Sequence, residues 1–244
     1  MRNASALVAA FVTTAACSSP APAPVPAPAD PPAPVVVPAP EPPAPAPTYA
    51  APPPTALTAQ GDAGGLAAWT ASKKAFFAQP LDAKGAPIAE PREVPLTSAH
   101  RLHAVYAVGG GFAVAAHDLC PDRKYFFKCL FLRAISAKGE PVGDELIVKT
   151  REWIREERVA RLGGVTGVLT SHMYIPPAFA RLTLAPDGAL VVDRRDLKVE
   201  EEVVDAVRLT AAEGRFVAIL RSESEDPARS IRLEIDAEGK VKGP

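Results

Sequence analysis

The stretch "CLFLRAISAKG" (129–139) decides the fold, because three other segments of the chain end in the same way. They are "AFFAQPLDAKG" (75–85), "AFARLTLAPDG" (178–188) and "RSIRLEIDAEG" (229–239). The final glycines, at positions 85, 139, 188 and 239, are 54, 49 and 51 residues apart. Self-similarity at such a period indicates a repeat architecture, so each segment marks one copy of a unit of about 50 residues.

Apolar residues recur at the fourth and at the eighth position before each of these glycines. The fourth positions are Leu81, Ile135, Leu184 and Ile235, and the eighth are Phe77, Phe131, Ala180 and Ile231. Because the spacing is even, they share one face of a β-strand. The position midway between them is Gln79, Arg133, Leu182 or Leu233, and we expect it at the solvent-exposed end of that face. The residues that follow predict a type I turn, with the glycine at positive φ and a bulge after it.

Each copy holds further strand-like pieces around this segment. A second shared block precedes it, as in "GGFAVAAHD" (110–118), with a shorter apolar piece upstream and another strand-like piece after the turn. Four short strands in about 50 residues are the content of one blade of a β-propeller. The last copy keeps only "KVKGP" (240–244), so we expect the piece near Thr55–Gln60 to pair with the last blade and close the ring. An open curved array of sheets, a β-sandwich and half-rings that close by dimerisation are the alternatives.

Two segments favour a helix locally but a strand by their place in the repeat. "TREWIREERVARL" (150–162) and "KVEEEVVDAVRLTAAEG" (198–214) combine good helix formers with apolar residues at three-to-four spacing. The repeat makes their C-terminal parts strands, and long-range packing overrides local propensity. We therefore predict strands there, with helical insertions before the third and fourth copies as the alternative.

The combined pattern resembles the degenerate propeller-type repeats of bacterial surface proteins. These join a Gly-rich turn, an apolar strand that often ends in Trp, a variable hairpin and an "LDAxG" turn, and only Trp69 keeps the tryptophan here. The resemblance covers residues 55–244. It implies an all-β fold: a small β-propeller-like domain of four repeats in residues 56–244, after a disordered Pro-rich linker.

The N-terminus predicts export and lipid attachment. Arg2 and the short apolar stretch "ALVAAFV" (6–12) are typical of a signal peptide, here residues 1–16. Ala15, Ala16 and Cys17 resemble the lipobox of bacterial lipoproteins, although Thr14 replaces the usual Leu. By that resemblance Cys17 is the acylated mature N-terminus, and "SS" after it favours the outer membrane. A secretory signal with a bystander cysteine is the alternative.

The linker, residues 17–55, predicts an extended stalk. Residues 20–54 contain 17 prolines. Proline lacks a backbone donor and fixes φ, so this run favours polyproline II. At roughly 3.1 Å per residue it would reach on the order of 100 Å and hold the domain clear of the membrane.

The two remaining cysteines are predicted to form a disulfide. Cys120 and Cys129 bracket "PDRKYFFK", a separation that suits a hairpin closed across its strands. An exported protein meets oxidising conditions, in which disulfides persist. Two free thiols are the alternative, and two cysteines alone supply too few ligands for a metal site.

Charge and motifs exclude several classes of function. Without Arg2, Asp30 and Glu41, which lie outside the predicted domain, the 27 basic and 28 acidic residues become 26 and 26. A neutral domain has no electrostatic footprint for nucleic acid. The charge runs at 151–158 and 198–205 are predicted to be solvated surface. Because no catalytic or nucleotide-binding motif is present, we expect neither a cofactor nor a metal.

Histidines are the candidate ligand-binding residues. His117 and His172 each follow the second shared strand of their copies, where Thr70 and Arg221 stand in the other two. Equivalent polar positions would line one mouth of a propeller channel, whereas the simpler reading makes each a cap at a strand end on the surface. The stretch "SAHRLHAV" (98–105), which holds the other two histidines, is predicted to be a loop entering a strand.

These features predict an envelope-anchored lipoprotein that displays a non-enzymatic binding or scaffolding domain. Its expected contacts are the membrane, through the N-terminal lipid, and a protein or glycan partner in the envelope. An envelope hydrolase that uses the propeller mouth and a purely structural spacer are the alternatives.

Overall fold

The computed structural model describes the chain from residue 47 onward. The described ranges are 47–62, 64–121, 128–150, 154, 156–171, 176–199, 203–222 and 230–242. The chain divides into two compact units, Met1–Pro45 and Ala46–Pro244, and all described residues belong to the second. The predicted signal peptide, Cys17 and most of the predicted linker therefore lie outside the described residues. Within the described ranges every regular element is a strand, and no helix is long and apolar enough to cross a membrane.

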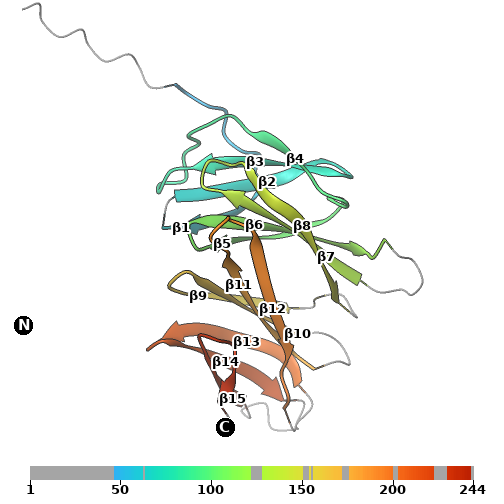
Figure 1. Ribbon diagram of the computed structural model, residues 1–244, viewed down its shortest axis with the longest axis vertical. Helices are drawn as coiled ribbons and strands as arrows, with labels where there is room; N and C mark the ends of the chain where they lie inside the picture. The colour runs from blue at the N-terminus through green and yellow to red at the C-terminus, as the bar shows by residue number, and fades with distance from the viewer. Residues whose placement is uncertain are drawn as a thin grey trace, which may run out of the picture. The chain divides into compact units, whose positions relative to one another are not determined.

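Four antiparallel sheets of four strands each make up the described part of the second unit (Figure 1). Sheet 1 contains β1 (Leu57–Gly61), β2 (Gly64–Ser72), β3 (Ala75–Leu81) and β4 (Arg92–Pro95). Sheet 2 contains β5 (Leu102–Val108), β6 (Gly111–Leu119), β7 (Lys128–Ser136) and β8 (Pro141–Thr150). Sheet 3 contains β9 (Glu156–Leu162), β10 (Val165–Ser171), β11 (Ala178–Leu184) and β12 (Leu190–Asp196). Sheet 4 contains β13 (Val203–Ala212), β14 (Arg215–Ser222), β15 (Ser230–Asp236) and β16 (Val241–Lys242).

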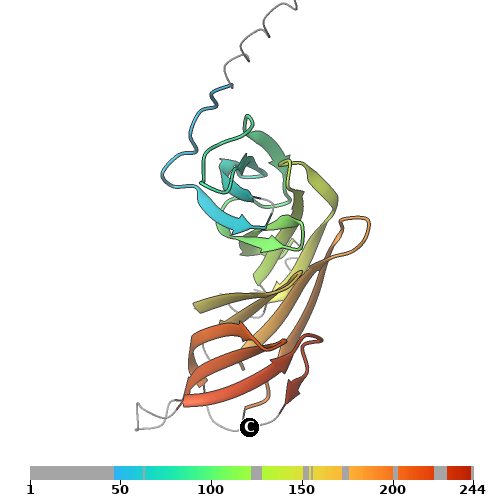
Figure 2. The same ribbon diagram turned by 90° about the vertical axis from the view of Figure 1, so that its left-hand side faces the viewer.

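Each sheet is a simple meander built from one predicted repeat. Strands that follow one another in the chain are neighbours in the sheet, which is the strand content and order of a propeller blade. Contacts join each sheet to the next one in the chain, and both ribbon views show this chain order in the colours from cyan to red (Figures 1 and 2). The predicted all-β fold with four blade-like repeats is confirmed at this level.

The predicted closure of the ring through pairing of the first strand with the last sheet is wrong. Strand β1 pairs with β2 of its own sheet, and the two-residue β16 completes sheet 4 by pairing with β15. Among the described residues no extensive contact joins sheets 1 and 4. The outer face of sheet 4 explains this, because Arg215 and Arg232 form ion pairs with Glu234 there, at 2.6 and 3.4 Å. These ion-paired side chains are stable in water, although half-buried Val217 and Ile219 lie beside them on the same face.

The repeated glycine serves both the turn and the packing between sheets. Gly85, Gly139, Gly188 and Gly239 have φ between 78° and 84°, as the predicted turn requires. A Cβ at Gly188 would lie 2.6 Å from Cγ1 of Val142, in the preceding sheet. Around Gly85, which has no preceding sheet, nothing lies within 4 Å. The turn therefore needs glycine for its backbone in every copy, and the close approach to the preceding sheet adds a second need in the later ones.

The apolar face of each repeat after the first packs against the preceding sheet. Phe131 and Ile135 belong to the core between sheets 1 and 2, and Ile231 and Ile235 to the core between sheets 3 and 4. The residue midway between these two positions was predicted near solvent. This is wrong for three copies, because Gln79, Leu182 and Leu233 are 0%, 3% and 3% exposed. The physical reason is that a neighbouring sheet or loop covers the whole length of this face, including its centre.

Both segments with helical propensity form strands in their C-terminal parts. Residues 156–162 are β9 and residues 203–212 are β13, as the repeat predicted. Residues 151–153, 155 and 200–202 lie outside the described residues. Pairing with β10 and β14 satisfies the backbone groups of these strands and outweighs the local preference.

The predicted disulfide is confirmed. Cys120 follows β6 directly and Cys129 lies in β7, with their Cα atoms 5.0 Å apart. Both cysteines are buried in the core between sheets 1 and 2. The bridge therefore closes the base of the hairpin whose residues 122–127 lie outside the described ranges.

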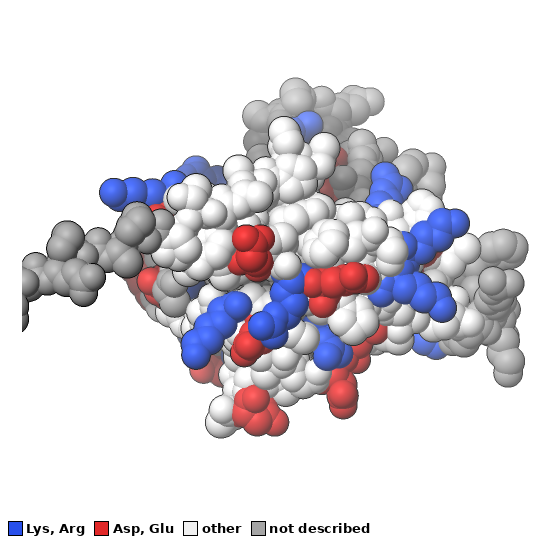
Figure 3. All heavy atoms as spheres, turned by 90° about the horizontal axis from the view of Figure 1, so that it is seen from above, with Lys and Arg blue, Asp and Glu red and all other residues white. Residues whose placement is uncertain are grey.

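Charged side chains on the face seen in Figure 3 are interspersed in sign, without a large patch of one charge. Several form pairs across the sheets, such as Arg161 with Asp62 at 2.9 Å and Arg92 with Glu140 at 3.1 Å. Exposed pairs of this kind contribute little to stability, so the fold depends mainly on the apolar cores between the sheets.

Candidate functional site: a cleft between sheets 2 and 3

The three interfaces between sheets are filled by different kinds of side chain. Phenylalanines pack between sheets 1 and 2, where Phe76, Phe112 and Phe131 are buried. Phe179 and Phe216 pack between sheets 3 and 4, with ring centroids 5.3 Å apart. Within the described residues, the core between sheets 2 and 3 contains aliphatic side chains and a single tyrosine, and many of its members are only half-buried.

This difference leaves a cleft between sheets 2 and 3. The empty space between its walls, open solvent at the mouth included, is about 470 Å³. Aliphatic side chains line both walls: Leu130, Leu132 and Val148 from sheet 2, and Val168, Ala180, Leu182 and Val192 from sheet 3. Apolar walls with a few polar groups at one end are typical of sites for apolar or amphipathic ligands.

The two sheets are held together beside the cleft at the end where the glycine turns lie. The Thr166 hydroxyl of β10 donates a hydrogen bond to the Ala107 carbonyl of β5. Nearby, a Cβ at Gly111 would lie 3.2 Å from Cδ1 of Leu184, so β6 and β11 are also close. The cleft therefore lies beside a direct contact between the two sheets.

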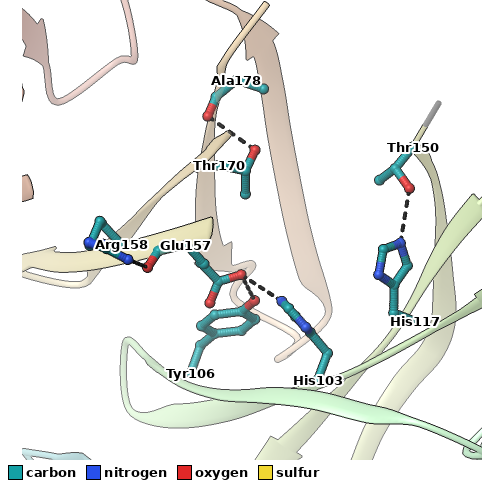
Figure 4. Close-up of polar contacts among 8 residues, drawn as sticks. All are labelled: His103, Tyr106, His117, Thr150, Glu157, Arg158, Thr170 and Ala178. Carbon is teal, nitrogen blue, oxygen red and sulfur yellow. Dashed lines mark hydrogen bonds and ion pairs between the residues drawn. The ribbon is translucent and has the colours of Figure 1, made fainter. Parts of the chain in front are cut away.

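Polar groups converge at the opposite end of the cleft (Figure 4). The Tyr106 hydroxyl of β5 donates to Oε2 of Glu157, in β9, over 2.8 Å. Nε2 of His103, also in β5, lies 3.0 Å from the same oxygen. The register of β5 against β6 shifts between Leu102 and Ala104, where His103 is the extra residue. Such bulges redirect a side chain, and here they accompany the meeting of His103 with the next sheet.

The surroundings of this cluster favour the neutral form of Tyr106. Burial raises the pKa of Tyr106 well above its ordinary value, and the negative charge of Glu157 and its hydrogen bond raise it further. Glu157 and His103 keep 15% and 24% of their side-chain surface exposed, so the cluster is largely but not fully enclosed. It can therefore offer hydrogen-bonding groups to the polar end of a bound molecule.

His117, one of the two predicted ligand-binding residues, lies beside this cluster. It is only 4% exposed, within β6, and its Nε2 lies 3.2 Å from Oγ1 of Thr150, a residue that lines the cleft. The His117 and His103 rings are 5.8 Å apart. The simpler reading of His117 as a surface cap is wrong, because neighbouring strands and sheet 3 enclose this face of β6.

The other positions of the predicted polar ring do not share this setting. His172 lies outside the described residues. Thr70 and Arg221 are exposed, and Arg221 forms an ion pair of 3.4 Å with Asp205. The four equivalent positions therefore do not form one uniform row, and the cleft between two sheets is the site that the structure offers.

Sequence reasoning missed Glu157 and Tyr106. Glu157 falls in the charge run 151–158, which was predicted to be solvated surface; this is wrong for Glu157, which reaches the interface between sheets. The signal that would have found Glu157 is the repeat itself. Glu157 stands 54 positions after His103, and Leu162 stands 54 positions after Val108 at the ends of the same two strands, so His103 and Glu157 occupy equivalent places in adjacent sheets.

The chemistry available at the cleft is hydrogen bonding and charge pairing beside an apolar slot. Within the ranges that the structure describes, no group of three or more His, Cys, Asp or Glu residues is arranged to hold a metal ion. Arg194 adds a cationic group to the lining and pairs with Asp196 at 3.0 Å.

Comparison with known proteins gives distant structural likenesses. No family model matches the chain, and no curated protein matches its sequence. Apo AztD from Citrobacter koseri is similar over 76% of this chain and 54% of its own, with 14% identity and a TM-score of 0.39. An engineered GH43 glycoside hydrolase with endo-xylanase and exo-arabinofuranosidase activity is similar over 77% and 39%, with 10% identity and a TM-score of 0.31. The chain spans about half or less of the length of these proteins.

Proposed function

We propose that this protein is a non-enzymatic binding module of the bacterial cell envelope, and that the cleft between sheets 2 and 3 is its binding site. The ligand is an amphipathic molecule with an aliphatic chain. The observation that carries the proposal is the division of the cleft into aliphatic walls and a polar end formed by Tyr106 and Glu157, with His103 hydrogen-bonded to Glu157 beside them. The chain of the ligand would lie between Leu132 and Leu182, with its polar group toward that end.

The lining favours an aliphatic ligand over a glycan. Sugar recognition uses many polar contacts and flat aromatic surfaces, whereas Tyr106 is the one aromatic residue among those that line the cleft within the described residues. Apolar walls with a few placed polar groups instead bind by burial of apolar surface and fix orientation at one end.

The envelope location is part of the proposal. Its basis is the lipobox-like "TAAC" ending at Cys17 and the Pro-rich stalk. The disulfide between Cys120 and Cys129 supports it, because such bonds persist in exported proteins and are rare in reducing compartments. Replacement of Cys17 by Ala should move the protein from the membrane fraction to the soluble fraction, and retention in the membrane would contradict the anchor.

A fluorescent fatty-acid probe tests the binding site. Dansyl-labelled undecanoate is titrated into the full chain, and we expect saturable binding. The variant Ala180→Phe places a ring in the cleft and should weaken binding by about tenfold or more, roughly 1.4 kcal/mol. Its matched control is Ala212→Phe, because Ala212 is exposed at the end of β13. Unsaturable binding, or equal binding by both variants, would contradict the proposed site.

An envelope hydrolase is the second candidate, favoured by the pairing of His103 with Glu157 at the cleft. An imidazole and a carboxylate at hydrogen-bond distance can exchange a proton with a substrate. Turnover of a nitrophenyl ester of a fatty acid, lost in His103→Gln, would establish this function. Probe binding without turnover would favour the binding module.

A further inference from the structure

The outer face of sheet 1 is buried although no sheet precedes it. Every other sheet packs this face against its predecessor, and sheet 1 would be expected to leave it in water. Yet Ala67, Gln79 and Leu81, which share this face, are all buried, and Gln79 has no exposed surface. Something other than a sheet therefore covers it.

Two extended segments of the chain provide the cover, and Gln79 connects them. Its side-chain Nε2 donates to the carbonyl oxygen of Ala50 over 2.9 Å and to that of Ala89 over 3.1 Å. A primary amide has two N–H donors, so both are used on backbone carbonyls. Ala89 belongs to the loop between β3 and β4, and Ala50 to the end of the proline-rich region.

The segment Pro47–Pro54, "PTYAAPPP", has the features of a bound polyproline strand. It contains no helix or strand. Tyr49, Pro52 and Pro53 are half-buried, while Ala50 and Ala51 are exposed. The spacing of three between Tyr49 and Pro52 fits the three residues per turn of polyproline II. Prolines leave carbonyl acceptors without N–H donors, and side-chain donors such as Gln79 supply the missing partner.

Aromatic side chains occur on the same face. Trp69 lies opposite Phe77 in the pairing of β2 with β3, and their ring centroids are 5.5 Å apart. By the alternation of a strand, both share the face of Gln79. Aromatic rings combined with donors to backbone carbonyls are the general means by which proteins recognise proline-rich peptides.

We propose that the outer face of sheet 1 is a binding site for an extended Ala- and Pro-rich peptide, occupied in this chain by its own residues 47–54. The site takes the place of a preceding sheet and clamps the end of the stalk to the domain. This inference is independent of the cleft and of any ligand bound there.

Limited proteolysis of the full chain tests the clamp. Chymotrypsin cleaves after Tyr49 when that segment is free, so the unchanged protein should resist cleavage there. The variant Gln79→Leu keeps the size of the side chain but removes both donors, and should accelerate cleavage at Tyr49 by about tenfold while the unfolding midpoint shows that the domain is intact. Lys242→Leu, an exposed position on β16 of sheet 4, is the control and should leave the rate unchanged.

A peptide added in trans tests recognition itself. The full chain is made with Tyr49, Pro52, Pro53 and Pro54 replaced by Ser, so that its own segment no longer fits, and with Trp153→Phe, so that Trp69 is the sole tryptophan. A peptide of residues 46–55 should change the Trp69 fluorescence saturably, and the same peptide with its three consecutive prolines replaced by Ser should not. Cleavage at Tyr49 as fast in the unchanged protein as in the free peptide, or no saturable change in fluorescence, would overturn the proposal.

Discussion

The two interfaces of sheet 2 differ in the size of the side chain at equivalent repeat positions, and one position shows this most clearly. The residue eight places before the turn glycine is Phe131 in sheet 2, and it fills the interface with sheet 1. The same position in sheet 3 is Ala180, and it leaves space in the interface with sheet 2. The comparison teaches that a repeat protein can build a binding cleft by a large-to-small change at an otherwise equivalent position, with no change in the strands.

The largest expected effect compares two adjacent residues of β7 that face opposite interfaces. Phe131→Ala should lower the free energy of unfolding by about 3–5 kcal/mol, because it opens a cavity in a filled core. Leu130→Ala, in the wall of the cleft, should cost less than about 1.5 kcal/mol because its side chain is already half-exposed to the slot. Urea unfolding measures both. Equal losses would mean that the two interfaces are packed alike.

Removal of the disulfide should have the next largest effect on stability. The bridge lies in the filled interface between sheets 1 and 2. Replacement of Cys120 and Cys129 by Ala together should lower stability by about 2.5–3 kcal/mol, because the bridge restricts the unfolded chain. The unchanged protein measured in reductant should lose a similar amount. A double variant as stable as the oxidised protein would show that the bridge contributes nothing.

Gly167 tests the packing of the other filled interface, between sheets 3 and 4. A Cβ there would lie 2.8 Å from Phe216 and 2.9 Å from Phe179, so Gly167→Ala should cost about 1–3 kcal/mol through overpacking. At Gly110 nothing lies within 4 Å of the added carbon, and Gly110→Ala should change stability by less than about 0.5 kcal/mol. No loss of stability in Gly167→Ala would contradict the tight packing of Phe179 and Phe216 around this position.

The smallest effect appears only in alkaline solution and concerns the polar end of the cleft. The pKa of Tyr106 is raised in the folded state, so its contribution is present below the unfolded value of about 10 and is lost as pH rises through the higher folded value. The urea midpoint of the unchanged protein should therefore fall more steeply above about pH 10 than that of Tyr106→Phe. Identical pH profiles would contradict the burial of this hydroxyl against Glu157.

The repeat made most of the fold predictable. The glycine spacing located all four sheets, and the alternation around Phe131 and Ile135 identified the packed face. Ring closure was not predictable from strand content, because it depends on whether the outer faces of the first and last sheets match. Here Arg232 and Glu234 place charged side chains on the outer face of sheet 4.

The candidate site was predictable only in part. His117 was singled out by its repeat position and does lie beside the cleft. Glu157 was not singled out, because the sequence around it is a run of charges typical of a surface. Its burial depends on the neighbouring sheet. The buried Gln79 was missed for the same reason, since its partners Ala50 and Ala89 lie in segments without a repeat signal.

A crystal soaked with dodecanoate that carries bromine on its terminal carbon tests the central claim most directly, since anomalous scattering locates the bromine. We predict one bromine site between Leu132 and Leu182, none in the interfaces that contain phenylalanine, and loss of the site in Ala180→Phe. No bromine in the cleft of the unchanged protein, or equal occupancy of all three interfaces, would contradict the account.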